Sequence, residues 1–198
     1  ARTKSQQQKQ PKKTMKKLLV LTSILALTGG VLGQGTVNFI NFVVNPAVDG
    51  RVTTASGALA GADYWGQLFA GADEGSLAAV GTPVAFRNTG AGAPTGVVSG
   101  GTVTIEGIPA GGAAFVQLRA WAAASGSSWD EASGNPVGEF GASNLIGLAS
   151  TGDPTAQPPG LPAALVGLQP FTLEVVPEPS TWALLALGLG ALALRRRK

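Results

Sequence analysis

Residues 101–107 read Gly-Thr-Val-Thr-Ile-Glu-Gly, and this stretch has the clearest structural pattern in the chain. Val103 and Ile105 alternate with two threonines and a glutamate. Successive side chains of a β-strand point to opposite faces of a sheet, so the alternation predicts a strand whose valine and isoleucine face a core. Turn-forming residues follow at 108–112, and residues 114–121 form the next strand-like run.

Further segments have the same strand-like composition. In residues 36–44, the side chains of Val37, Phe39 and Asn41 fall on one side of a strand. No segment has the periodicity of a long helix, and residues 121–132 favour at most a helical turn or a loop. Six or seven short strands separated by turns predict an all-β fold, an antiparallel β-sandwich or jelly-roll. The remaining predicted strands are residues 64–70, 84–87 and 171–175.

The composition excludes two broad classes of protein. The chain has 198 residues, of which 29 are glycine and 13 are proline; 44% are hydrophobic and only 13% are charged. A disordered chain needs low hydrophobicity and high net charge. A helical bundle needs fewer glycines and more helix-forming charged residues. The length favours a single folded domain.

The chain contains no cysteine and no histidine. Disulfides, thiolate nucleophiles, Cys/His zinc sites and imidazole-based triads are therefore excluded. We predict no catalytic residue, no cofactor, no metal site and no enzymatic activity. Two carboxylate-based alternatives stay open, a glycoside hydrolase and a calcium-binding adhesin. The candidate acids for hydrolysis are Asp63, Asp73, Glu74, Glu106, Asp130, Glu131 and Glu139. The candidate calcium loops are residues 49–50, 73–75 and 130–131, none with EF-hand spacing.

The formal net charge of +3 conceals two basic ends and an acidic body. Residues 1–17 contain seven lysines or arginines, and residues 195–198 are all basic. Residues 34–176 contain ten acids and three arginines, which gives this part a net charge of −7. Nucleic acid binding requires a basic surface, so we predict no nucleic acid partner.

Residues 15–33 have the layout of a signal peptide. Met15 is followed by two lysines, an apolar run over residues 18–27, and small residues up to Gly33. A basic start, a short apolar core and small residues before a cleavage point are typical of exported proteins. We expect cleavage before Gln34, with residues 1–14 a disordered basic extension upstream of the true start.

Residues 177–198 combine three features in a fixed order. The motif Pro177-Glu178-Pro179 comes first, and thirteen apolar residues follow over 182–194. This run predicts a short transmembrane helix with Trp182 at the membrane interface. The basic residues after the helix are expected to stay in the cytoplasm, which leaves the body outside. They are Arg195, Arg196, Arg197 and Lys198.

Together these features resemble the PEP-CTERM sorting signal of Gram-negative bacteria. The resemblance implies recognition of Pro177, Glu178 and Pro179 by an exosortase, a transpeptidase-like membrane enzyme, and cleavage near the motif. It also implies a transient membrane anchor, a cell-surface or extracellular destination, and an association with exopolysaccharide and biofilm. An uncut tail anchor is the alternative. Residues 35–39 and 117–121 are similar to small exported PEP-CTERM proteins of the Verrucomicrobia and Planctomycetes type, which implies architecture and no chemistry.

The leading interpretation is a non-enzymatic, exported surface or extracellular-matrix protein. The main alternative is a carbohydrate-binding β-sandwich module whose exposed aromatic rings, from Trp129 and Tyr64, stack on sugars. Trp65 and Trp121 lie within strand patterns and are expected to fill the core. The predicted divisions are an extension (1–14), a signal peptide (15–33), a β-sandwich body (34–149), a proline-rich loop (150–163), a last strand region (164–176) and the sorting signal (177–198).

Overall fold

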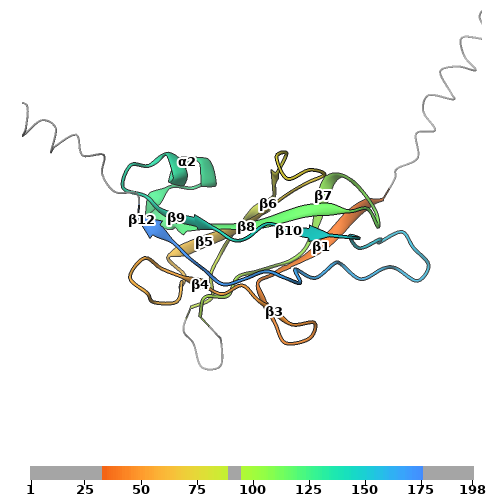
Figure 1. The fold of residues 1–198 in the computed structure, drawn as a ribbon, viewed down its shortest axis with the longest axis horizontal. Helices are drawn as coiled ribbons and strands as arrows, with labels where there is room; N and C mark the ends of the chain where they lie inside the picture. The colour runs from red at the N-terminus through yellow and green to blue at the C-terminus, as the bar shows by residue number, and fades with distance from the viewer. Residues whose placement is uncertain (1–32, 89–94, 176–198) are drawn as a thin grey trace, which may run out of the picture. The chain divides into compact units, whose positions relative to one another are not determined.

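The structure, a computed structural model, describes residues 33–88 and 95–175, which are coloured in Figure 1. All described residues belong to one unit of the chain, residues 33–198. The predicted signal peptide, apart from Gly33, and the motif and tail of the predicted sorting signal lie outside the described residues. Strands predominate in the described part, which confirms the all-β prediction.

A six-stranded antiparallel sheet forms the centre of the fold (Figure 1). Its strands are β5 (Tyr64–Gly71), β6 (Ala78–Ala85), β8 (Ala114–Ala122), β9 (Glu139–Ala142), β10 (Ile146–Leu148) and β12 (Glu174–Val175). The spatial order is β12-β9-β8-β5-β6, and β10 pairs with the first residues of β8. β8 pairs with β5 from Tyr64↔Ala122 to Gly71↔Phe115, so these two strands form the longest pairing of the sheet.

A second, two-stranded sheet is formed by β1 (Gln34–Ile40) and β7 (Ser99–Pro109), which pair antiparallel with Val37 opposite Val103. In β7, Ile105 is buried whereas its polar neighbours Thr104 and Glu106 are exposed, as the alternating sequence predicts. Two pairs of very short strands complete the described fold. They are the antiparallel pair β2 (Phe42–Val43) with β3 (Val48–Asp49), and the parallel pair β4 (Val52–Thr53) with β11 (Phe171–Thr172).

One hydrophobic cluster joins the two sheets. Fully burying a valine, leucine, isoleucine or phenylalanine side chain in this cluster stabilises the fold by roughly 1.5–3 kcal/mol relative to leaving it exposed. The β1–β7 pair contributes Val37, Phe39, Ile105 and Ile108. The central sheet contributes Leu68, Ala70, Val80, Ala114, Val116, Leu118, Ala120, Ile146 and Leu148.

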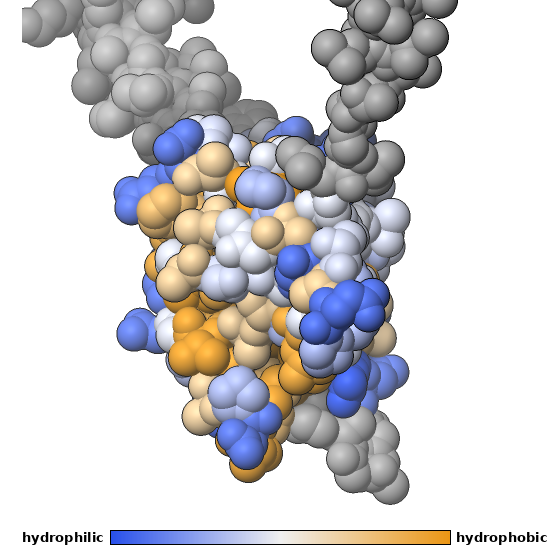
Figure 2. All heavy atoms as spheres, turned by 90° about the vertical axis from the view of Figure 1, so that its right-hand side faces the viewer, coloured by the Kyte–Doolittle hydropathy of each residue, from blue (hydrophilic) through white to orange (hydrophobic). Residues whose placement is uncertain are grey.

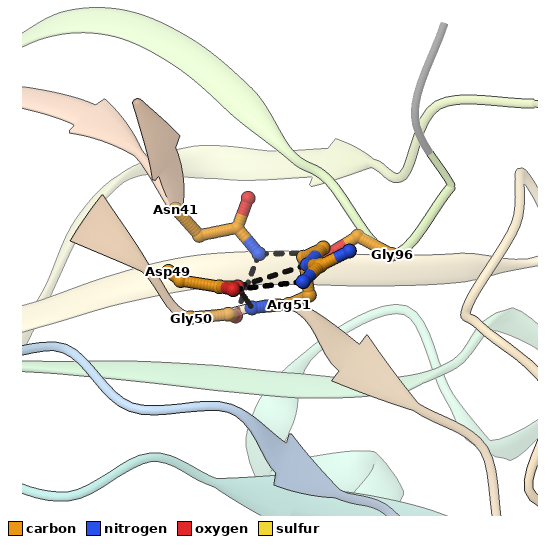
Figure 3. Close-up of polar contacts among 5 residues, drawn as sticks. All are labelled: Asn41, Asp49, Gly50, Arg51 and Gly96. Carbon is orange, nitrogen blue, oxygen red and sulfur yellow. Dashed lines mark hydrogen bonds and ion pairs between the residues drawn. The ribbon is translucent and has the colours of Figure 1, made fainter. Parts of the chain in front are cut away.

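Asn41, between β1 and β2, is a fully buried polar residue (Figure 3). Its Nδ2 donates to the carbonyl oxygens of Gly50 (2.8 Å) and Gly96 (2.9 Å), and its Oδ1 accepts from the backbone N–H of Val98 (2.8 Å). These bonds tie three segments together where no regular ladder connects them. Since all its polar atoms have partners, Asn41 stabilises the fold despite its burial.

An ion pair lies next to this amide. The Arg51 guanidinium donates from Nε (2.9 Å) and Nη2 (2.8 Å) to the two carboxylate oxygens of Asp49 (Figure 3). Its central carbon lies 5.3 Å from the Phe42 ring centre. The hydrogen bonds from Arg51 lower the pKa of the Asp49 carboxyl, although partial burial opposes them. One of the predicted calcium loops, residues 49–50, therefore has its carboxylate engaged by an arginine.

Two predicted strands differ from the observed ones. The strand predicted at 84–87 corresponds to β6, which begins earlier, at Ala78, and ends at Ala85. Gly81 and Pro83 lie at a register irregularity opposite β5 rather than in a turn. The strand predicted at 171–175 is divided at Leu173, which is fully buried. The N–H of Leu173 donates to the Thr53 carbonyl (2.8 Å), and the chain passes from one sheet to the other at this residue.

Two short helices follow β8. They are the 3-10 helix η1 (Ala123–Ser125) and the α-helix α2 (Trp129–Gly134), which packs against β8 and β9. For residues 121–132 the sequence left a helical turn and a loop open, and the structure has η1 and the first residues of α2 there. The candidate calcium loop at 130–131 therefore lies in a helix. No helix among the described residues is long and apolar enough to cross a membrane.

The proline-rich segment 150–163 lies at the end of the fold away from α2 (Figure 1). It contains no helix or extended strand of its own, but bridges at Gly152 and Ala163 attach it to Thr36 and Val37 of β1. This end of the molecule faces the viewer in Figure 2, where hydrophobic and hydrophilic side chains are interspersed.

Candidate functional site

The two faces of the central sheet differ in their side chains. On the face towards the core, Leu68 of β5 lies opposite Leu118 of β8. On the other face, which we call the outer face, Trp65 lies opposite Trp121, and Trp121 lies opposite Phe140 of β9. Aromatic rings therefore gather on the outer face, where α2 packs.

Trp129, the first residue of α2, contacts three aromatic rings of the outer face. Its ring centre lies 5.4 Å from Phe140, 6.3 Å from Phe69 and 6.3 Å from Trp121, and all three pairs meet edge to face. Edge-to-face pairs at such distances contribute about 0.5–1.5 kcal/mol beyond their buried area. We call this group of four rings the outer aromatic cluster.

Arg119 covers one side of the cluster. Its guanidinium carbon lies 4.1 Å from the Phe69 ring centre and 5.1 Å from that of Trp129, and its Nε donates to Gln117 Oε1 (2.9 Å). Partial burial lowers the pKa of Arg119, while the charge of Asp130 raises it. The arginine stays protonated and holds Trp129 against the sheet.

Local hydrogen bonds fix the helix that carries Trp129. Ser128 caps α2, since its Oγ accepts from the N–H of Glu131 (3.2 Å). Glu131 Oε2 accepts from both the N–H (2.8 Å) and the hydroxyl (2.7 Å) of Ser127, and these bonds lower the pKa of the Glu131 carboxyl. The indole N–H of Trp121 donates to the Gly126 carbonyl (3.0 Å), which anchors the preceding loop to the sheet.

A hollow of about 480 Å³ opens beside Trp129, at the edge of the sheet formed by β9 and β12. We call it the Trp129 hollow. Trp129 and Phe140 supply its rings, and both side chains are partly exposed. Glu174 lies directly opposite Phe140 in the β12–β9 register and is exposed. The complete lining is Trp129, Phe140, Gly141, Ala142, Thr172, Glu174 and Val175.

Tyr64, the second residue predicted to bind sugar, belongs to the other face of the sheet. It is partly buried and packs against the hydrophobic cluster. Its hydroxyl donates to Glu139 Oε2 (3.0 Å), and Glu139 Oε1 accepts from the N–H of Ala55 (2.7 Å). Burial, followed by the hydrogen bond to Glu139, raises the pKa of Tyr64. Tyr64 and Trp129 therefore do not form one sugar-stacking platform.

The two tryptophans within strands, Trp65 and Trp121, differ in their burial. Trp121 is fully buried, as predicted, but on the outer face rather than in the main core. Trp65, which was expected to fill the core, is instead partly exposed on the outer face, where it meets Trp121 edge to face at 6.5 Å.

The candidate acids are spread over the described residues. Glu139 accepts hydrogen bonds from Tyr64 and Ala55, and Glu131 accepts a hydrogen bond from Ser127. Asp73, Glu74, Glu106 and Asp130 are exposed, as is Asp63. Within residues 33–88 and 95–175, no three or more acids form a group that could hold a metal ion.

Sequence reasoning missed three residues of the site, namely Phe140, Arg119 and Glu174. The alternation of Gln117, Arg119 and Trp121 already indicated that the arginine shares a face with an aromatic ring. No comparable pattern connects Phe140 with Glu174, because the two residues meet only through the pairing of β9 with β12.

Comparison with known proteins found a match at the C-terminal end of the chain. Residues 175–198 match the PEP-CTERM protein-sorting motif, and the match begins at the last residue of β12. The match includes Pro177, Glu178 and Pro179. It supports a secreted surface protein that is processed by an exosortase, a membrane enzyme. No significant match was found among curated proteins or among solved structures.

Proposed function

We propose that this chain is an exported surface or extracellular-matrix protein whose C-terminal segment is a sorting signal cut by an exosortase. The match of residues 175–198 to the PEP-CTERM motif carries the proposal. In this function Pro177, Glu178 and Pro179 form the recognition motif. The apolar run 182–194 holds the chain transiently in the membrane, with Trp182 at its interface and residues 195–198 in the cytoplasm.

The body delivered to the surface acts by binding rather than by catalysis. The absence of cysteine and histidine from the sequence removes the commonest nucleophiles and general bases. We propose that the body is a β-sandwich in which the β1–β7 pair faces the central sheet. The shared hydrophobic cluster of Val37 and Leu118 supports this arrangement.

A second candidate function, glycan binding within an exopolysaccharide or biofilm, is favoured by the Trp129 hollow. Two partly exposed rings and an exposed carboxylate line one open site. Ligand sites typically combine aromatic walls with a few polar groups in this way. Of the two residues first considered for sugar stacking, the geometry favours Trp129 over Tyr64, whose hydroxyl is bonded to Glu139.

The test of the sorting function is the intact mass of the mature protein in each cell fraction of the native host. We expect a species that begins near Gln34, ends close to Pro179 and lacks residues 195–198. The double variant Pro177→Ala/Pro179→Ala should keep residues 195–198 and stay in the membrane fraction. The control variant Pro154→Ala, in the exposed loop, should be processed normally. A wild-type protein that keeps Arg195 to Lys198 in the membrane would make the tail an uncut anchor.

A further inference from the structure

We propose that the Trp129 hollow binds a sugar unit carrying a free amino group, as found in polymers of hexosamines that lack their N-acetyl groups. This inference rests on the glycan-binding function and deepens it. It does not depend on processing of the tail.

The hollow offers aromatic surface to a ring-shaped ligand. Trp129 and Phe140 stand edge to face at 84°, so the two rings present surfaces in different directions. Gly141 and Ala142 line the hollow with backbone and a single methyl group, so Phe140 is the one bulky side chain that β9 contributes to the lining. A volume of about 480 Å³ is in the range of small-molecule sites.

The charge of the hollow favours a cation. Glu174 is the one charged residue of the lining, and no basic side chain of the described residues lies within ion-pair distance of it. The sequence around it, residues 34–176, has a net charge of −7. An acidic polysaccharide would be repelled, whereas an ammonium group would be attracted to the carboxylate.

The aromatic rings add to this preference. An ammonium group within about 6 Å of a ring centre is attracted by the negative face of the ring. On an amino sugar, the apolar C–H face of the pyranose would lie against Trp129 or Phe140 while the ammonium reaches Glu174. A lysine side chain offers the same charge but only a thin methylene chain to fill the hollow, so the shape favours the sugar.

Arg119 does not compete for Glu174. It contacts Trp129 and Phe69 from β8, is not part of the lining, and is bonded to Gln117. Asp130, the first acidic residue of α2, acts on Arg119 electrostatically and offsets its charge.

The experiment measures binding of the purified full chain to three soluble probes, namely oligomers of glucosamine, of N-acetylglucosamine and of glucose. The proposal expects binding to the glucosamine oligomer, with weaker binding at higher salt. The variant Glu174→Gln should weaken this binding by about tenfold, the loss expected on removing a charge-assisted contact. Glu74→Gln is the matched control, because Glu74 is an exposed acid in the β5–β6 loop.

Each other outcome overturns the proposal. Equal binding of the glucose and glucosamine oligomers would leave a glycan site but remove the role of the amino group. An equal loss in Glu74→Gln would mean that the overall negative charge attracts the oligomer without a site. Failure of all three probes to bind would remove the glycan-binding function as well. Trp129→Phe keeps a ring on α2 and should bind the glucosamine oligomer more weakly, while its far-UV circular dichroism stays that of the wild type.

Discussion

The two faces of the central sheet are built from the same strands but in different ways. The inner face carries aliphatic side chains such as Leu68 and Leu118, which are 1% and 0% exposed and are closed in by β1 and β7. The outer face carries rings, closed in mainly by Trp129 and Arg119. Stability is therefore concentrated on the inner face, while groups able to contact a ligand gather on the outer one.

The largest expected effect comes from breaking the inner face. Leu118→Ala leaves a cavity in the middle of β8, because the side chain is fully buried between the two sheets. We expect the free energy of unfolding to fall by about 2–5 kcal/mol, measured by urea denaturation. A loss below about 1 kcal/mol would contradict the claim that this face stabilises the fold.

A smaller loss is expected on the outer face. Trp129→Ala removes three edge-to-face contacts, but the ring is partly exposed, so its loss leaves no sealed cavity. We expect the free energy of unfolding to fall by about 1.5–2 kcal/mol, measured in the same urea titration, because partial exposure keeps each of the three contacts near the lower end of its range of about 0.5–1.5 kcal/mol. Trp129→Phe is the control and should recover part of the loss. A loss larger than that of Leu118→Ala would reverse the ranking of the two faces.

The inner face was more predictable from the sequence than the outer one. The alternation around Ile105 and the apolar run of β8 depend on neighbours two residues apart, and both strands were found where predicted. Residues 171–175 alternate in the same way and predicted a single strand. The structure divides them into β11 and β12 because the two halves pair with different strands, β4 and β9.

The candidate site combines residues that only tertiary pairing brings together. Trp129 was recognised as a candidate, but its neighbours Phe140 and Glu174 are joined to it by α2 packing and by the β9–β12 register. Tyr64 and Trp65 are adjacent in sequence and point to opposite faces of β5, which separates Tyr64 from the outer face. The aromatic residues of the sequence suggested stacking on a sugar, but the pairing of the strands determines which rings share a site.

The contribution of Arg119 to stability tests the outer face further, because its charged guanidinium lies over two of the rings there. Arg119→Gln keeps a polar side chain but removes the cation from above Phe69 and Trp129. We expect the free energy of unfolding to fall by about 0.5–1 kcal/mol at low salt. The exposed Arg87→Gln is the control and should stay within about 0.5 kcal/mol of the wild type. Equal effects of the two variants would mean that stacking of the arginine adds no stability.

The smallest expected effect is the response of α2 to acid. Hydrogen bonds from Ser127 lower the pKa of Glu131 below its ordinary value of 4.5 in the folded chain. A carboxyl with a depressed folded pKa stabilises the fold fully above its unfolded pKa, and this stabilisation is lost as the pH falls through the folded pKa.

The stability advantage of the wild type over Glu131→Gln should therefore be present at pH 7 and shrink below pH 4.5. Urea denaturation of both proteins between pH 7 and pH 3 measures this difference, and an advantage that grows in acid would mean that Glu131 does not hold the start of α2 as a carboxylate. Since α2 carries Trp129, the same titration reports how firmly the outer face is closed.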